Sequence, residues 1–279
     1  YVEELGMTLY SAEDDVTERN TWILGIVIAS IAVVVLGVGI YFFVSGDKNE
    51  FDPVTGCPIV DGQISPHSQM VVIVDETDTL TPIQSDSLKV ALKNLVNNEL
   101  TEGSLLSIYT ITEDFSTSRK PVFEACKIRD GSHANQFTEN ERKLKRRFET
   151  FFKAPLSNLI SQITEKNEPA KSSPIMEVVQ SVSVNSMQKW ATPETRLIIF
   201  SDMLHHTPGF SLYQTKPSFA AFKGTAYAAQ VKTMLNGASV DLYYFVNNPK
   251  FQGQNNVTFW RDYFRSTGAT VESVIPLGK

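Results

Sequence analysis

The fold is decided by residues 70–75, which read M-V-V-I-V-D, five apolar residues followed at once by a carboxylate. A short continuous apolar run predicts a strand that is buried on both faces, as in a parallel sheet covered by helices. Later in the chain, similar runs alternate with segments of helical spacing. We expect further strands at 105–111, 121–128, 196–201, 240–246 and 270–275. This alternation predicts an α/β fold with a doubly wound, mostly parallel six-stranded sheet.

The helices between these strands are predicted from apolar residues spaced three or four apart and from capping residues. The Ala154-Pro155 pair is expected to bend or end the helix that contains residues 144–152, because proline removes a helical hydrogen bond. Ser173 is expected to cap a helix that has Pro174 in its first turn. Further helices are expected over 88–96, 218–236 and 257–266.

The overall composition is that of a globular protein, with 42% hydrophobic and 20% charged residues. These values exclude a disordered or collagen-like chain. The chain carries 25 Lys and Arg against 31 Asp and Glu, a formal charge of −6. Because binding to phosphate backbones needs concentrated basic residues, we expect no nucleic-acid partner.

One segment departs from this average: residues 22–44 contain no charged side chain. These 23 residues exceed the roughly 20 that cross a bilayer, and aromatic residues stand at both ends. A cleaved signal peptide is the alternative, but its leading arm would be basic and its apolar region shorter. The preceding arm is acidic, so we expect a single-pass transmembrane helix. The expected organisation is an arm over 1–21, the helix, a linker over 45–68 and an α/β domain over 69–279.

Few signals orient this predicted anchor, since only Arg19 and Lys48 lie near its ends. The two cysteines, Cys57 and Cys126, fit a disulfide formed in an oxidising compartment, although two buried free thiols remain an alternative. A short arm, one helix and a large following domain favour a domain outside the cytoplasm, either periplasmic or extracellular. A spacing of small residues in the helix is compatible with packing against other membrane subunits.

Chemistry-bearing residues gather after the first predicted strand, where Asp75, Thr77 and Thr79 form a D-x-T-x-T run. Ligands of open α/β sheets lie beyond the carboxyl ends of the strands, and two further residues, Ser173 and Asp202, are expected there. Carboxylate and hydroxyl oxygens suit Mg²⁺, with Mn²⁺ or Ca²⁺ as alternatives. Hydroxyls add no negative charge, so the ion stays electrophilic toward an outside carboxylate. We therefore predict that these five residues are metal ligands.

These motifs resemble those of the von Willebrand factor A-type domains and their metal ion-dependent adhesion site. That family has D-x-S-x-S after its first strand, a Thr before a helix on a second loop, and an Asp after its fourth strand. This chain matches all three in order, with Thr replacing Ser at Thr77 and Thr79 and with Ser replacing Thr at Ser173. The resemblance covers residues 69–275. It implies the family's fold and a metal-dependent protein-interaction site.

Other polar residues surround the predicted ligands, and each has an ordinary interpretation as a loop residue. The rim is expected to contain Glu76, Asp78, Ser172, Ser201, His205 and His206. The adjacent histidines could supply a ligand or carry a proton. A basic cluster over 142–147 indicates either a solvated helix face or a surface for acidic lipids or an acidic partner. The cysteines have no zinc-binding spacing.

Three functions follow from these patterns. The first is a membrane-anchored interaction module, not an enzyme, whose metal is completed by an acidic residue of a partner protein. The second is a metal-dependent phosphoester hydrolase that uses the carboxylates near Asp75. The D-x-D pattern of phosphatases fails for this function, because Thr77 stands at the second Asp position. The third is a structural subunit of a membrane assembly with a vestigial metal site.

Overall fold

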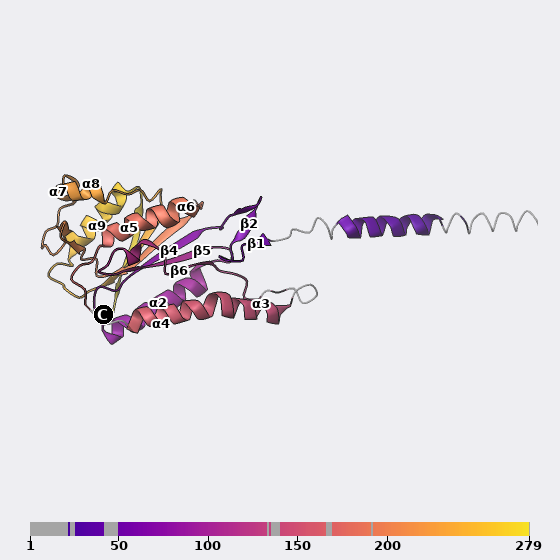
Figure 1. Ribbon diagram of the computed structural model, residues 1–279, viewed down its shortest axis with the longest axis horizontal. Coiled ribbons are helices and arrows are strands. Elements are labelled where there is room, and N and C mark those ends of the chain that lie inside the picture. The colour runs from indigo at the N-terminus through magenta and orange to yellow at the C-terminus, as the bar shows by residue number, and fades with distance from the viewer. Residues whose placement is uncertain are drawn as a thin grey trace, which may run out of the picture. The chain divides into compact units, whose positions relative to one another are not determined.

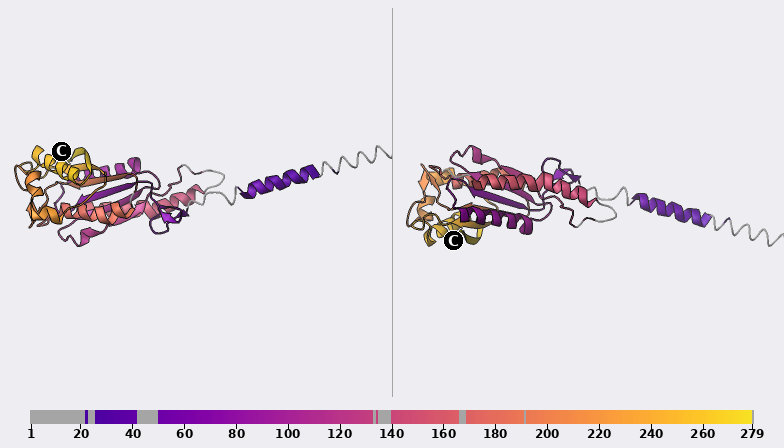
Figure 2. Two further views of the ribbon diagram at one scale, coloured as in Figure 1. Left: turned by 90° about the horizontal axis from the view of Figure 1, so that it is seen from above. Right: turned by 90° about the horizontal axis from the view of Figure 1, so that it is seen from below.

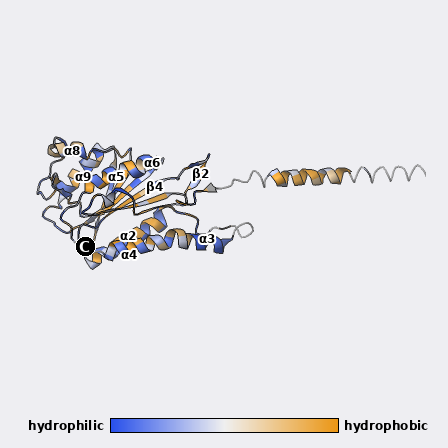
Figure 3. Cartoon of the chain, in the orientation of Figure 1, coloured by the Kyte–Doolittle hydropathy of each residue, from blue (hydrophilic) through white to orange (hydrophobic). Residues whose placement is uncertain are grey.

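The computed structural model describes residues 22, 26–41, 50–132, 134, 140–165, 169–190 and 192–278. The chain divides into two compact units, Tyr1–Asn49 and Glu50–Lys279 (Figure 1). In the first unit, residue 22 and residues 26–41 are helical, and most of this helix is hydrophobic (Figure 3). Its large hydrophobic side chains are exposed. The other residues of the predicted span 22–44 lie outside the described residues. Within the described part of the chain, no helix is both long enough and apolar enough to cross a membrane.

The second unit is built on a six-stranded sheet with the order β11-β10-β7-β4-β5-β6. Neighbouring strands are parallel except β6, which pairs antiparallel with β5. This arrangement confirms the predicted mixed α/β fold and its mostly parallel six-stranded sheet. The strands are β4 (Gln69–Asp75), β5 (Leu105–Ile111), β6 (Phe123–Cys126), β7 (Thr195–Ser201), β10 (Ser239–Phe245) and β11 (Thr270–Leu277).

The order of the strands reverses between β4 and β7. From β4 the chain moves outward through β5 to β6, and then returns to the other side of β4 to form β7 and, farther out, β10 and β11. The loops that follow β4 and β7 therefore run in opposite directions. A gap between such loops at the carboxyl ends is the usual ligand position in open α/β sheets.

Hydrophobic side chains fill both faces of the sheet, because β4, β5 and β7 are buried almost throughout. On one face, alternate residues of the strands pack with α5 (Ile175–Val182) and α9 (Gln254–Ser266). On the other face they pack with α2 (Pro82–Asn94) and α4 (Ala154–Glu165). Figure 2 shows the sheet between these helical layers. Because successive side chains of a strand point to opposite faces of the sheet, the strands contribute to both cores.

Of the two expectations for Pro155, that it bends or ends its helix, the ending is wrong. The helix runs as α3 (Glu141–Phe148), a π-helical turn (Glu149–Lys153) and α4, without ending at Pro155. Pro155 stands in the first turn of α4, directly after the π-turn, which shifts the hydrogen-bond pattern where proline lacks an N–H. Two other helices also continue through π-turns: α2 into Leu95–Glu99, and α5 into Ser183–Met187 and α6 (Gln188–Trp190).

The single helix expected over 218–236 is also wrong. The segment forms two short helices, α7 (Phe219–Lys223) and α8 (Ala226–Gln230), and each has its own side-chain cap. Ser218 accepts a hydrogen bond from the N–H of Ala221, and Thr225 accepts one from the N–H of Ala228. The second cap begins a new helix where the sequence periodicity alone suggested continuation.

Residues 50–68, expected as a linker, contain an antiparallel sheet of β1 (Glu50–Phe51), β2 (Pro58–Val60) and β3 (Gln63–Ile64). A disulfide joins Cys57 to Cys126 and confirms the predicted pairing. It attaches this segment to the last residue of β6. The remaining short elements are the 3₁₀ turn Thr117–Arg119, β8 (His206–Thr207) and β9 (Phe210–Ser211).

Candidate metal site

The predicted ligands come from three segments that meet at the carboxyl ends of β4 and β7. Asp75 is the last residue of β4, and Asp202 directly follows β7. Ser173 lies two residues before α5. Asp75, Asp202 and Ser173 are buried, with exposed fractions of 3%, 3% and 8%. The site therefore lies at the point where the strand order reverses, as the sequence predicts.

Hydroxyl groups surround the carboxylate of Asp75. Thr77 donates to Oδ1 from its hydroxyl at 2.6 Å and from its backbone N–H at 3.0 Å. Ser201 and Ser173 donate to Oδ2 at 2.7 and 3.2 Å. A hydroxyl that donates its proton keeps its lone pairs, so each of these oxygens can still accept a metal ion. The ring of oxygens is therefore compatible with a hard cation.

The second carboxylate, Asp202, lies in an unfavourable environment for negative charge. Burial raises the pKa of Asp202 well above its usual range, and repulsion by Asp78 and Asp75 raises the pKa further. Burial also raises the pKa of Asp75, against the opposing effect of its hydroxyl donors. A bound cation would offset both the desolvation and the mutual repulsion.

Asp78, expected at the rim of the site, interacts directly with Asp202. Its charge raises the pKa of the carboxyl group of Asp202. The chain leaves the strand conformation after Asp75, so Asp78 lies in the loop that follows β4. Asp78 thus belongs to the acidic cluster of the site.

Backbone hydrogen bonds hold the three loops together. The N–H and C=O groups of Ser173 and His206 pair in both directions, at 2.8 and 3.0 Å. The N–H of Ala170 donates to the carbonyl of Thr77 at 2.9 Å. Ser173 does not cap α5, because its side chain bonds Asp75 and Pro174 occupies the cap position without a side-chain bond. The expected capping role of Ser173 is therefore wrong.

The loop after Asp202 is fixed by residues that belong to none of the motifs recognised in the sequence. Met203 has a left-handed backbone, with φ of +58°, and its carbonyl accepts a 2.8 Å hydrogen bond from the indole N–H of Trp260. The side-chain amide of Gln252 donates to the carbonyls of Asp202 and Phe245, at 2.7 and 2.6 Å. These contacts tie the ends of β7 and β10 together and set the direction of Asp202.

The other predicted residues occupy varied positions at this edge. Thr79 is exposed, whereas Glu76 and Ser172 are half-buried. Ser201 is completely buried and is bound to Asp75, so it belongs to the centre of the site rather than to its rim. His206 is exposed, and its Nδ1 lies 3.0 Å from the hydroxyl of Ser211.

His205 differs most from its neighbour, because it is completely buried. Its Nε2 lies 3.0 Å from the hydroxyl of Tyr227, which also donates to Glu177. Burial, reinforced by the charge of His206, lowers the pKa of His205 to about 3. A neutral histidine is therefore part of the packing behind the site, and its ring lies within hydrogen-bond distance of the N–H of Met176 and the hydroxyl of Tyr227 rather than of the predicted ligands.

The donor set is made mainly of hydroxyls and carboxylates. The described residues contain no group of three or more His, Cys, Asp and Glu side chains that could hold a metal ion. The candidate set instead combines Asp75 and Asp202 with the hydroxyls of Thr77 and Ser173. Such oxygens favour Mg²⁺, Mn²⁺ or Ca²⁺ over softer metals.

Comparison with known proteins gives similarity in structure but not in sequence. No protein-family model matches the chain, and no curated protein matches its sequence. Among solved structures, the chain is similar to the crystal structure of the human COPII-coat protein Sec24c, at 12% sequence identity and a TM-score of 0.41. The match covers 78% of this chain and 30% of that chain. The chain thus spans under a third of the length of that protein.

Proposed function

We propose that this chain is a membrane-anchored protein-interaction module whose domain is of the von Willebrand factor A type. Its metal site would hold Mg²⁺, or alternatively Mn²⁺ or Ca²⁺. The supporting observation is the convergence of three hydroxyl groups on Asp75 beside a second buried carboxylate. The proposed ligands are Asp75, Thr77, Thr79, Ser173 and Asp202.

A partner protein would complete this site with an acidic side chain. The five proposed ligands leave one position of an octahedral Mg²⁺ open, and three of them are hydroxyls that contribute no charge. The ion would therefore attract a further carboxylate from outside. Recognition of this kind needs no nucleophile or general base, so we propose binding rather than catalysis.

The position of the site within the domain supports this function. Cys126 pairs with Leu105 at the beginning of β5, whereas Asp75 pairs with Ile111 at its end. At about 3.3 Å per residue, about 20 Å separate these two edges of the sheet. The chain enters the domain near the disulfide, at the amino edge of β5. A partner would therefore approach the metal at the opposite edge, away from the entry point.

We propose that residues 22–44 anchor the module as a single transmembrane helix and that the domain lies outside the cytoplasm. Support comes from the uncharged sequence of this segment and from the disulfide between Cys57 and Cys126. Disulfides persist mainly in oxidising compartments such as the periplasm and the cell exterior. Other subunits of a membrane assembly could pack against the same helix.

Metal titration of the purified chain tests the site. Calorimetry and the paramagnetic resonance signal of free Mn²⁺ measure Mn²⁺ binding. We expect the wild type to bind Mn²⁺ and Mg²⁺ to compete with it. Asp75→Asn and Asp202→Asn should each abolish binding, whereas Asp86→Asn, which changes an exposed carboxylate on α2, should not. Circular dichroism establishes that each variant is folded. Equal Mn²⁺ affinity in wild type and Asp75→Asn would refute the metal site.

The hydrogen bonds around Asp75 also favour a second function, a structural subunit with a vestigial site. Thr77, Ser173 and Ser201 donate hydrogen bonds to both oxygens of this carboxylate. In that case the chain would bind no Mn²⁺ at all, and Asp75→Asn would change stability alone. The same titration therefore separates the two functions.

A further inference from the structure

The helix α3 presents a strongly basic surface. Its eight residues, E-R-K-L-K-R-R-F, contain five basic side chains and one acidic side chain. At 100° per residue, the basic side chains cover a continuous arc of about 200°, and Leu144 and Phe148 occupy the opposite side. Leu144 and Phe148 are half-buried, whereas all five basic residues are exposed. Figure 3 shows this helix as one of the most hydrophilic parts of the domain.

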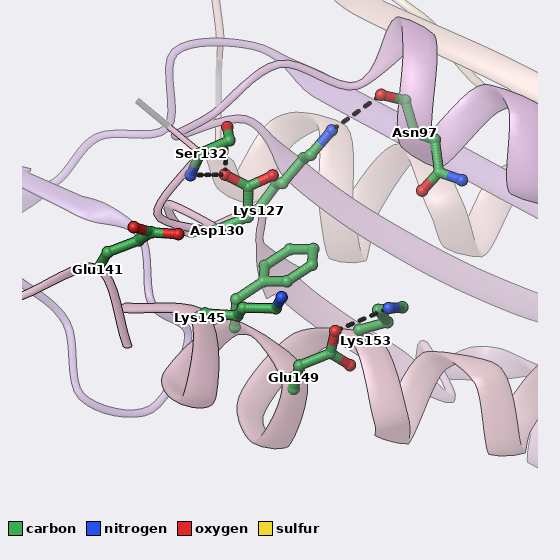
Figure 4. Close-up of a pocket in the computed structure, with 9 residues that line it drawn as sticks. Asn97, Lys127, Asp130, Ser132, Glu141, Lys145, Glu149 and Lys153 are labelled. Carbon is green, nitrogen blue, oxygen red and sulfur yellow. Dashed lines mark hydrogen bonds and ion pairs between the residues drawn. The ribbon is translucent and has the colours of Figure 1, made fainter. Parts of the chain in front are cut away.

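The charge of this helix is not compensated by the described part of the domain. None of its five basic side chains forms an ion pair with a described residue. Figure 4 shows the side chain of Lys145 at a pocket, with no interaction drawn to its ammonium group. The whole chain has more acidic than basic residues, so the cluster does not follow from a basic composition.

The basic helix lies beside the point where the chain enters the domain. Phe51 of β1 lines a small pocket together with Leu144 and Arg147 of α3. The neighbouring Gly56 packs against Phe151 so closely that an added Cβ would lie 2.8 Å from its ring. Figure 1 shows β1, β2 and α3 at the same end of the domain. The disulfide at Cys57 fixes this entry segment to the sheet.

Chain connectivity limits how far this end of the domain can be from the predicted anchor. Phe51 follows Val44 by seven positions in the chain. An extended chain spans at most about 3.3–3.6 Å per residue, which limits the separation of these two residues to about 25 Å. A membrane that contains residues 22–44 would therefore present its headgroups at high effective concentration to the neighbouring helix.

We propose that the basic face of α3 binds the anionic headgroups of the membrane in which the chain is anchored. This inference rests on the membrane anchor of the proposed function, but not on the metal site. A lipid surface fits better than a folded partner, because the charges spread over a convex arc of about 200°, and long basic side chains reach headgroups individually. Such contacts would orient the domain, with the edge that carries Asp75 pointing away from the bilayer.

The experiment uses the full chain reconstituted in nanodiscs of phosphatidylcholine, with or without phosphatidylglycerol. A fluorophore at Glu141→Cys reports its distance to lipids that carry a nitroxide headgroup quencher. We expect stronger quenching in anionic discs than in neutral discs, and its loss between about 0.1 M and 1 M salt. Arg142→Gln, Lys145→Gln and Arg146→Gln combined should abolish the difference between the two discs.

A matched variant separates this helix from general charge effects. Lys216→Gln, Lys223→Gln and Lys232→Gln remove three exposed positive charges elsewhere on the domain. This variant should keep the wild-type quenching in anionic discs. Equal quenching in neutral and anionic discs, or an equal loss in both triple variants, would overturn the proposal.

Incorporation into the discs tests the anchor independently. If the chain does not enter the discs, the anchor is wrong, and the same chain is tested by flotation with vesicles of both compositions. Binding to anionic vesicles that the α3 variant weakens on the order of 100-fold would still support the headgroup contact. Absence of binding would overturn it. Mn²⁺ titration of the same samples reports on the metal site separately.

Discussion

The hydroxyl of Ser201 donates a 2.7 Å hydrogen bond to Oδ2 of Asp75, although 126 residues separate them in the chain. The bond joins the ends of β7 and β4, both of which are buried. The same hydroxyl accepts a 2.8 Å bond from the N–H of Met203. One buried oxygen therefore stabilises the carboxylate of the proposed metal site and the loop that carries Asp202.

Replacing this serine should destabilise the domain. Ser201→Ala leaves the N–H of Met203 unsatisfied and removes one donor from Asp75, so we expect a loss of about 2 kcal/mol in the free energy of unfolding. Urea unfolding followed by circular dichroism measures it. Ser157→Ala, on the exposed side of α4, is the matched control and should leave the stability within about 0.5 kcal/mol. A similar small change for Ser201→Ala would contradict the prediction.

The hydroxyl of Thr77 should be needed for metal binding, whereas its methyl group should not. Thr77→Val preserves the shape but removes the oxygen, and we expect Mn²⁺ affinity to fall about 10–100-fold. Thr77→Ser keeps the oxygen and should bind Mn²⁺ as the wild type does. Calorimetric titration of the three proteins makes the comparison. Loss of affinity in both variants would indicate that packing of the methyl group, not ligation, dominates.

Reduction of the disulfide should strongly destabilise the domain. The bond between Cys57 and Cys126 closes a loop with a sequence separation of 69 residues. The loss of loop-closure entropy predicts a stabilisation of about 4 kcal/mol. Urea unfolding with and without dithiothreitol measures this difference, and gel mobility without reductant checks that the bond is present. An unchanged unfolding midpoint after complete reduction is incompatible with the prediction.

The buried His205 should make stability depend on pH. Burial lowers its pKa from 6.5 to about 3, so the unfolded state binds a proton that the folded state does not. The contribution of neutral His205 to the free energy of unfolding is complete above pH 6.5. It decreases as the pH falls toward 3, with a slope of up to about 1.4 kcal/mol per pH unit.

A comparison of variants isolates this effect. Asp75, Asp202 and Glu177 have raised pKa values and act in the opposite direction, so the informative quantity is the difference between wild type and His205→Gln. This difference should shrink from pH 6.5 to pH 5 in urea unfolding. His67→Gln, at an exposed histidine, should keep the wild-type slope. Parallel stability curves for wild type and His205→Gln would exclude the effect.

Local sequence predicted the elements whose boundaries depend on local chemistry. The six predicted strands are all present, and the signal was clearest for β4, β5 and β7, because a strand at the centre of a covered sheet has apolar side chains on both faces. Helical continuity was predicted less well. Pro155 did not end its helix, since a π-turn precedes it, and Thr225 started a new helix because its side chain caps the next turn. Both outcomes depend on hydrogen-bond geometry that periodicity does not contain.

For the site, the sequence by itself determined which donors are available and on which edge of the sheet they lie. Asp75 and Asp202 follow apolar strands, and parallel strands place their carboxyl ends together. The sequence placed Ser201 and Asp78 only at the rim of the site. Tertiary structure alone decided that Ser201 bonds Asp75, that Asp78 acts on Asp202 and that Gln252 holds the loop after Asp202. The physical reason is that these contacts link residues far apart in the sequence, which local patterns do not describe. They form only after the sheet has brought the loops together.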